Sequence, residues 1–236
     1  MTFFYKNAIN VFTDASLVRK NDTPITCSGF ITMQDGNIID KGLKVIHGST
    51  NMYGEIYAIK MGIENLLQYK DTDRFLNLFS DSRVSIFGLR EWIMLWYSNS
   101  QDKILKNSSN VPVYNQEVIL EIMRLIVQSK VHVNFYHIPG HMRPNNEEDM
   151  SKFRSIFLKN FNSDNYFNNP LSCIPNDILV EMCVYNNMID KMSRHYLNQI
   201  VESKDYDPNK YKRYSIYPFY WFPKEQDMET YQQLII

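Results

Sequence analysis

Apolar and polar positions alternate in the first part of the chain and predict strands there. Residues 9–13 form a short apolar run that leads into Asp14-Ala15-Ser16, so we expect a strand that ends in a polar turn, followed by a loop over 17–24. Two further alternating runs, 25–33 and 38–46, are separated by a short segment that contains an Asp-Gly pair. Because this pair between two such runs is a strong hairpin signal, we predict a three-stranded antiparallel meander.

After residue 50 the apolar spacing changes to three and four positions, which is typical of amphipathic helices. The further predicted elements are a helix over 52–69, a strand over 75–79, a helix over 84–97, a polar loop over 98–111, a helix over 118–127, a strand over 131–136, a loop over 137–149 and a helix over 177–200. Residues 150–176 show no clear period, and the tail over 201–236 is charged and rich in tyrosine. This order, strands first and then strands joined by helices, predicts a mixed α/β fold.

Composition narrows the class of protein. The chain has 236 residues, 44% of them apolar, and a net charge of −1, which excludes a strongly disordered chain and a polycation that neutralises nucleic acid in bulk. Its three cysteines, Cys27, Cys173 and Cys183, form no C-x-x-C pair, so we expect reduced, buried thiols. No apolar run approaches the ~18 residues of a membrane span, and no signal-peptide order is present. We therefore expect an intracellular, cytoplasmic protein without membrane contact (in the host cytoplasm if the chain is viral).

Three acidic residues occur at positions where their side chains can converge. Asp14 follows the first predicted strand, Asp81 follows the fourth, and Glu55 lies on the first turn of the helix between them. Neighbouring strands lie ~4.8 Å apart, so carboxylates at adjacent strand ends can meet. Converging carboxylates are hard oxygen ligands that suit Mg²⁺ or Mn²⁺, and two such ions can promote phosphoryl displacement. Taken singly, each acid can equally be a surface or capping residue.

Six sequence blocks resemble, in order, the motifs of the type 1 ribonuclease H family. They are FTDAS at 12–16, STNMYGE at 49–55, FSDSRVSIFGL at 79–89, PVYN at 112–115, HIPGH at 137–141 and NMIDKMSR at 187–194. The resemblance covers about residues 8–141 and again 184–198. It implies a ribonuclease H-like α/β fold: a mixed five-stranded sheet, three strands antiparallel and then two parallel, flanked by helices.

The same resemblance implies a metal centre and a proton-transfer residue. Asp14, Glu55, Asp81 and Asp190 would be the metal-binding carboxylates for two Mg²⁺ ions, which Mn²⁺ could replace, and Asp14 would bridge both ions. His141 would lie on a flexible loop and assist proton transfer or product release, because an imidazole exchanges protons near neutral pH. A plain loop histidine is the alternative.

Substrate contacts follow from the resemblance as well. The residues that would contact an RNA–DNA hybrid are Thr50, Asn51, Ser82, Arg83 and Asn115. An A-like duplex exposes its 2′-hydroxyls in a wide minor groove, where short polar side chains can reach them. Thr50 and Asn51 can also cap the following helix, and the two functions are compatible.

Aromatic and basic residues leave further options open. Trp92 and Trp96 are spaced i, i+4, so core packing is the simpler interpretation and direct DNA contact the alternative. Lys103 and Lys106 could form a small basic protrusion. In the tail, three basic residues stand beside the aromatic run YSIYPFYWFP, which could bind nucleic acid or pack onto the domain; they are Lys210, Lys212 and Arg213.

One departure from the family pattern concerns the fourth carboxylate. His141 and Asp190 are separated by 49 positions (190 − 141), farther than is usual in the family, and Asp149 lies at a more ordinary separation. We prefer Asp190 because the residues around it fit the family helix, and keep Asp149 as the alternative. Under this choice residues 143–183 are an insertion near the active site of a catalytic domain over 1–200, and 201–236 form a C-terminal extension.

The function that the resemblance implies is metal-dependent endonucleolytic hydrolysis of the RNA strand of RNA–DNA hybrids, giving 5′-phosphate and 3′-hydroxyl ends by a two-metal-ion mechanism. One alternative is a nuclease of the same fold that acts on branched or other DNA. Another is a non-catalytic module that binds nucleic acid. We expect a monomer.

Overall fold

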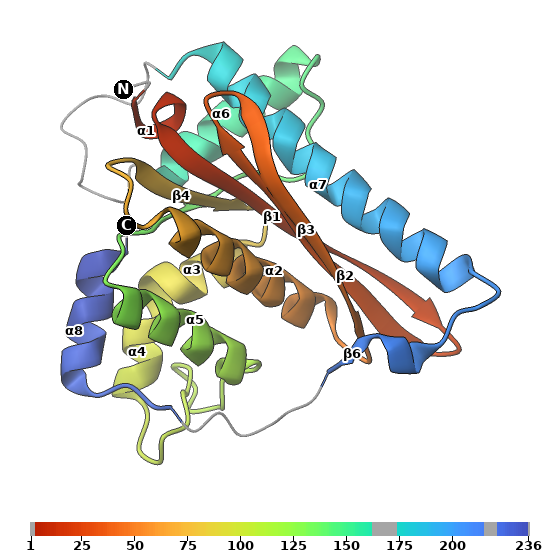
Figure 1. The fold of residues 1–236 in the computed structure, drawn as a ribbon. Coiled ribbons are helices and arrows are strands. Elements are labelled where there is room, and N and C mark those ends of the chain that lie inside the picture. Colours follow the sequence, from red (N-terminus) through yellow and green to blue (C-terminus); the bar gives the residue numbers. More distant parts are fainter. Residues whose placement is uncertain (1–2, 162–173, 215–220, 236) are drawn as a thin grey trace.

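A six-stranded sheet forms the centre of the computed structural model, which describes residues 3–161, 174–214 and 221–235 (Figure 1). The strands are β1 (Ala8–Lys20), β2 (Thr23–Gln34), β3 (Asn37–His47), β4 (Phe75–Ser80), β5 (Asn134–His137) and β6 (Lys212–Arg213). Their order is β5-β4-β1-β2-β3-β6. The pairs β1–β2 and β2–β3 are antiparallel, whereas β4 pairs in parallel with β1 and β5 pairs in parallel with β4. The predicted five strands and their directions are confirmed, and β6 adds a short parallel partner to β3.

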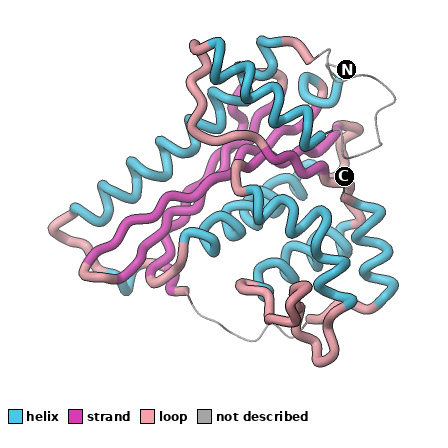
Figure 2. The backbone as a smooth tube through the Cα atoms, turned by 180° about the vertical axis from the view of Figure 1, so that it is seen from behind, coloured by secondary structure: helices cyan, strands magenta, loops and turns pink. Residues whose placement is uncertain are grey.

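Two groups of helices cover opposite faces of this sheet (Figures 1 and 2). The helices are α1 (Phe3–Lys6), α2 (Asn51–Leu66), α3 (Arg83–Phe87), α4 (Ile93–Ser98), α5 (Gln116–Ser129), α6 (Glu147–Phe161), α7 (Asn176–Glu202) and α8 (Glu225–Leu234), with a π turn over Gly88–Trp92 and 3₁₀ turns over Leu67–Tyr69 and Pro208–Lys210. Alternation along the strands divides the core between these faces. Val11 and Leu78 face the cluster of α2, α5 and α8, while Phe12 and Phe79 face that of α6 and α7.

The first hairpin is longer than the sequence indicated. The predicted loop over 17–24 is wrong: β1 continues to Lys20, and a turn at Asn21 and Asp22 leads directly into β2. Both turn residues have positive φ angles of 50° and 60°, which Asn and Asp tolerate better than most residues. The long hairpin has its own small core, in which Leu197 of α7 packs against Ile25 and Cys27. This cover explains why the strands extend so far.

The predicted second hairpin is confirmed. Asp35 and Gly36 form the turn between β2 and β3 with φ angles of 50° and 79°, as a tight turn between twisted strands requires.

The helix predictions succeed except in one region. The helices expected over 52–69, 84–97, 118–127 and 177–200 are confirmed to within a few residues. No clear period predicts an element over residues 150–176, but α6 runs from Glu147 through residue 161. Phe153 and Phe157 of this helix, one turn apart, are buried. The three acids in its first turn interact favourably with the positive N-terminal end of the helix dipole. The remainder of that stretch up to residue 173 lies outside the described residues.

The C-terminal tail adds core residues to the molecule. Met228, Tyr231 and Leu234 of α8 belong to the main hydrophobic cluster, and the Tyr231 hydroxyl donates a hydrogen bond to the Leu89 carbonyl at 2.8 Å. Trp221 packs against the same cluster. The tail therefore contributes to the same core as the sheet, at least over its described part.

Two smaller expectations can be checked. Cys27 and Cys183 are buried free thiols as predicted, and Cys173 lies outside the described residues. Among the described helices, none combines the length and apolar character that a membrane crossing requires.

Candidate active site

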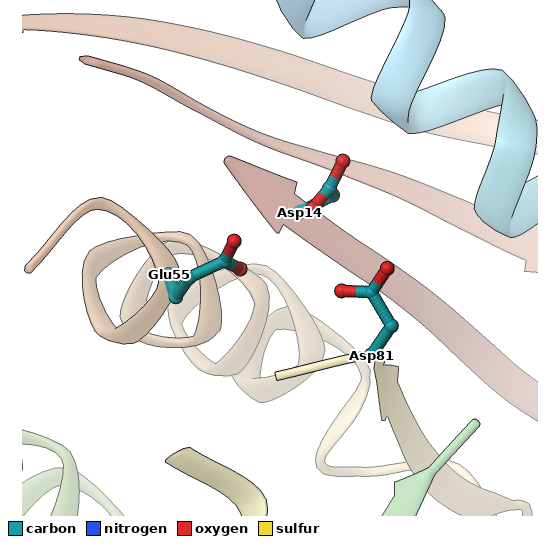
Figure 3. A group of neighbouring side chains, drawn as sticks. All are labelled: Asp14, Glu55 and Asp81. Carbon is teal, nitrogen blue, oxygen red and sulfur yellow. The ribbon is translucent and has the colours of Figure 1, made fainter. Parts of the chain in front are cut away.

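Three carboxylates meet near the centre of the sheet. Asp14, Glu55 and Asp81 each offer one oxygen, and these oxygens all lie within 4.8 Å of one another (Figure 3). They come from β1, α2 and the residue after β4. The convergence predicted from the sequence is therefore present, although Asp14 and Glu55 reach it from positions in their elements that differ from those expected.

Two of the three predicted positions need correction. Asp14 does not end a strand: it lies in the middle of β1, immediately beyond Thr13, where the parallel pairing with β4 stops opposite Ser80. Glu55 is not in the first turn of its helix, because α2 begins at Asn51 and its first turn carries no acid. Asp81 directly follows β4, as expected.

Close packing of α2 on the sheet brings Glu55 to the strands. Gly54 lies so near the sheet that a Cβ atom there would be 3.1 Å from the Cβ atoms of Ala15 and Thr26. The Ser28 hydroxyl donates a hydrogen bond to the Gly54 carbonyl at 2.7 Å. A larger side chain at position 54 would push the helix, and Glu55 with it, away from Asp14.

The electrostatics of the trio favour a bound cation. Burial, with repulsion from Asp81, raises the pKa of Asp14 to about 8. Burial and repulsion from Asp14 hold the pKa of Glu55 well above its ordinary value, and burial raises the pKa of Asp81. Within the described part of the chain, Glu55 Oε2 is buried and has no hydrogen-bond partner. Two buried carboxylates and one half-buried carboxylate that repel one another, with one oxygen that no described residue hydrogen-bonds, form a donor set that Mg²⁺ or Mn²⁺ would fit.

Asp190 and His141 line the same cavity as the trio. Asp190 extends from α7, and its Oδ1 accepts a hydrogen bond from Arg194 Nη2 at 2.8 Å. The Nδ1 atom of His141 lies 3.7 Å from Asp190 Oδ2. His141 itself is exposed and has a φ angle of 56° in the left-handed region. The structure thus brings together all five residues for which the sequence indicated chemistry.

The packing of α7 explains the position of Asp190. Gly29 of β2, the cross-strand partner of Asp14, has no side chain, and a Cβ atom there would be 2.7 Å from Ile189 Cδ1. The Oγ atoms of Ser16 and Ser193 lie 2.9 Å apart and join α7 to β1. These two contacts on either side of Asp190 hold α7 against the strand that carries Asp14.

The alternative fourth acid, Asp149, has a different environment. It lies in the first turn of α6 and forms an ion pair with Arg143, whose Nε is 2.7 Å from Asp149 Oδ2. Arg143 lowers the pKa of Asp149 by hydrogen bonding. The described cavity that contains the trio is lined by Asp190 and not by Asp149.

The sequence indicated only some of the residues that pack against Asp81 and the loop of His141. The Asn187 amide donates to the Met142 carbonyl at 2.7 Å, directly after His141. Asn186 was missed: its buried side chain makes a hydrogen bond to Asp81 that lowers the pKa of that carboxyl. Gly140 was also missed, and a Cβ atom there would be 2.1 Å from Asp81 Oδ2.

Of the five predicted substrate residues, Asn51 lines the cavity that contains the trio, and Thr50 directly precedes it at the start of α2. Thr50 caps α2, since its Oγ1 accepts a hydrogen bond from the Tyr53 backbone at 3.2 Å. The Asn51 side chain makes a hydrogen bond to Glu55 that lowers the pKa of Glu55.

The other three substrate candidates precede or begin helices. Ser82 and Ser85 share a hydroxyl–hydroxyl hydrogen bond of 2.7 Å, and the Arg83 guanidinium lies 5.5 Å from the centre of the Phe87 ring. Asn115 precedes α5 with a φ angle of 58°.

An apolar cavity of about 270 Å³ lies beside these residues, between α2, the π turn and the loop before α5. Trp96 lines it and packs against the main core, and its ring lies edge-to-face with Trp92 at 6.1 Å. Of the two lysines in the polar loop, Lys106 is paired with Asp102 at 3.5 Å. Core packing is thus established for Trp96, while contact with nucleic acid stays a prediction.

Comparisons with known proteins agree with this arrangement. The sequence model of the family described as RNase H matches residues 6–151. Ribonuclease H of Tropheryma whipplei (strain Twist) is 32% identical over 129 residues, which is 55% of this chain and 72% of that protein; the protein of strain TW08/27 gives the same figures.

Two solved structures are similar at lower identity. LC11-RNase H1 from compost is 17% identical, with a TM-score of 0.43 over 66% of this chain and 97% of that chain. The foamy viral protease-reverse transcriptase in complex with an RNA/DNA hybrid is 15% identical, with a TM-score of 0.48 over 57% of this chain and 18% of that chain. The family match includes the trio, His141 and Asp149, and ends before Asp190.

Proposed function

The chain belongs to the RNase H family, and from this premise we propose that it hydrolyses the RNA strand of RNA–DNA hybrids. The observation that carries the proposal is the convergence of Asp14, Glu55 and Asp81 within 4.8 Å. Such a site on a ribonuclease H sheet is suited to hydrolysis of a phosphodiester.

The metal part of the proposal rests on the donor set. Asp14, Glu55, Asp81 and Asp190 would hold two Mg²⁺ ions, for which Mn²⁺ could substitute. The buried Glu55 Oε2, for which the described residues offer no hydrogen bond, supports a cation at this point. When bound, such ions stabilise the negative charge that develops on the phosphodiester oxygens.

Other side chains would prepare the site for reaction. Arg194 holds the Asp190 carboxylate by its hydrogen bond, and Asn186 does the same for Asp81. The imidazole of His141, exposed beside Asp190, would transfer a proton to or from the reacting group. We expect products with 5′-phosphate and 3′-hydroxyl ends.

Recognition of the hybrid would use short polar side chains. Thr50, Asn51, Ser82, Arg83 and Asn115 would contact the backbone and the 2′-hydroxyls from the minor groove. Contacts of this kind distinguish RNA from DNA without reading the sequence. We expect a monomer to be sufficient, since every residue named here belongs to one chain.

A substrate panel tests the proposal. The protein is incubated with a hybrid labelled on either strand, with duplex DNA, duplex RNA and branched DNA, in Mg²⁺, Mn²⁺ or EDTA. We expect cleavage of the RNA strand of the hybrid alone, only with metal, and products that a 5′-phosphate-specific exonuclease degrades. The Asp81→Asn variant is the inactive control. Cleavage confined to branched DNA, or binding without cleavage, would contradict the proposal.

A further inference from the structure

The C-terminal segment reaches the proposed substrate surface at Tyr214. β6 lies parallel to the end of β3, with Lys212 opposite Ile46 and Arg213 opposite His47 (Figure 1). The backbone N–H of Tyr214 then donates to the His47 carbonyl at 2.9 Å. This pairing sets Tyr214 next to the start of α2, which follows β3 after a short connection.

The Tyr214 side chain contacts the predicted substrate residue Asn115 directly and is linked to a second one, Thr50, through Tyr53. Its ring lies edge-to-face with Tyr53, with centroids 4.4 Å apart, and the Tyr53 backbone donates to Thr50 Oγ1. Its hydroxyl donates a hydrogen bond to Asn115 Oδ1 at 3.2 Å. Tyr214 therefore lies between the N-terminus of α2 and the residue before α5.

This hydrogen bond determines which end of the Asn115 amide can bind a ligand. A carboxamide has an oxygen that accepts and an NH₂ group that donates. Because the Asn115 oxygen accepts the hydrogen bond from the Tyr214 hydroxyl, the NH₂ group points to the other side of the amide, where it can donate to a phosphate or sugar oxygen. The Asn115 side chain makes no capping bond to α5, so that helix does not occupy either end of the amide.

We propose that Tyr214 is a positioning residue for the substrate: it orients the Asn115 amide toward the nucleic-acid backbone and makes the C-terminal segment part of the substrate-binding surface. The inference rests on the proposed function, because it concerns the same hybrid. Two exposed cations precede Tyr214, namely Lys212 and Arg213, and they add attraction for a phosphate backbone. At Tyr214 the described part of this segment thus packs onto the domain and, on this proposal, also contributes to binding.

A double-mutant cycle tests the inference. Hybrid binding is measured by fluorescence anisotropy in the cleavage-inactive Asp81→Asn protein, with Tyr214→Phe, Asn115→Gly and both changes together. Phenylalanine keeps the ring contact with Tyr53 and removes only the hydroxyl, and glycine tolerates the positive φ at position 115. Tyr211→Phe is the matched control, because Tyr211 is in the same segment and stacks on Tyr206 instead.

We expect Tyr214→Phe to raise the Kd for the hybrid about three- to tenfold, because one hydrogen bond is lost. When Asn115 is already glycine, the same change should cause no further loss of affinity. In the cleavage-competent protein the same change should raise KM and leave kcat and Tm unchanged, which a purely structural role would not produce. Unaltered binding by Tyr214→Phe, or a full second loss in the Asn115→Gly background, would overturn the inference. If the parent protein neither binds nor cleaves the hybrid, the proposed function fails first and this inference fails with it.

Discussion

At the scale of single residues, the site is a compromise between stability and function. The oxygens of Asp14, Glu55 and Asp81 lie within 4.8 Å of one another, and burial, together with repulsion from neighbouring carboxylates, raises the pKa of all three. A site that binds cations through such groups destabilises the metal-free fold, because charged groups are costly to bury without partners.

Replacement of one acid should reveal this cost. In EDTA, Asp14→Asn should raise the free energy of unfolding by about 1–3 kcal/mol near pH 8 and abolish cleavage. The sign follows from the raised pKa of Asp14, about 8 when folded against 3.8 as the ordinary value. Between these values the folded carboxyl keeps a proton that the unfolded chain releases, so wild-type stability falls as pH rises from about 4 to 8.

The gain from Asp14→Asn should therefore grow over that pH range when urea unfolding is followed at several pH values. Asp149→Asn is the matched control. The pKa of Asp149 is lowered by Arg143, so its replacement should reduce stability and not increase it. A destabilised Asp14→Asn protein at pH 8 would show that burial and repulsion of the charged Asp14 carboxylate are not the dominant effects at the trio.

Residue identity was easier to predict than residue placement. The sequence predicted Asp14, Glu55 and Asp81 correctly as a converging set, because each stands in a recognisable local pattern. It could not show that Asn186, and not its neighbour Asn187, contacts Asp81, because two adjacent asparagines on a helix differ only in the direction that tertiary packing gives them.

At the scale of elements, helix packing decides which acids meet. Local periodicity predicted α2, α5 and α7 well, since each buries one apolar face. It did not predict α6, and it missed β6, a two-residue strand defined only by its pairing with β3. Long-range pairing of this kind leaves no periodic signal in the sequence.

The docking of α8 gives a stability prediction. The Tyr231 side chain is fully buried and bonded to the Leu89 carbonyl within the π turn. Tyr231→Ala should lower the free energy of unfolding by about 3–5 kcal/mol, because it removes a large buried ring and leaves a cavity. The matched control is Tyr196→Ala on α7, where the side chain is 40% exposed and the change should stay within about 0.5 kcal/mol.

Chemical denaturation of both variants provides the measurement. A Tyr231→Ala protein as stable as the wild type would mean that the C-terminal helix is a detachable extension and not part of the core.

At the scale of the whole molecule, the fold combines a family sheet with additions on both sides. The sheet order and the strand directions could be predicted, because the motifs occur in family order. The family match ends at residue 151, yet α7 at 176–202 covers the sheet and brings Asp190 beside the trio. The chain between them, which includes α6, therefore separates two parts of one proposed site.

Cleavage of an RNA-labelled hybrid in Mg²⁺ decides whether Asp190 completes the acidic site. The wild-type protein is compared with Asp190→Asn and Asp149→Asn. We expect Asp149→Asn to cleave at nearly the wild-type rate, whereas Asp190→Asn should lose at least about a hundredfold in rate. An active Asp190→Asn protein with an inactive Asp149→Asn protein would contradict this expectation and assign the fourth carboxylate to α6.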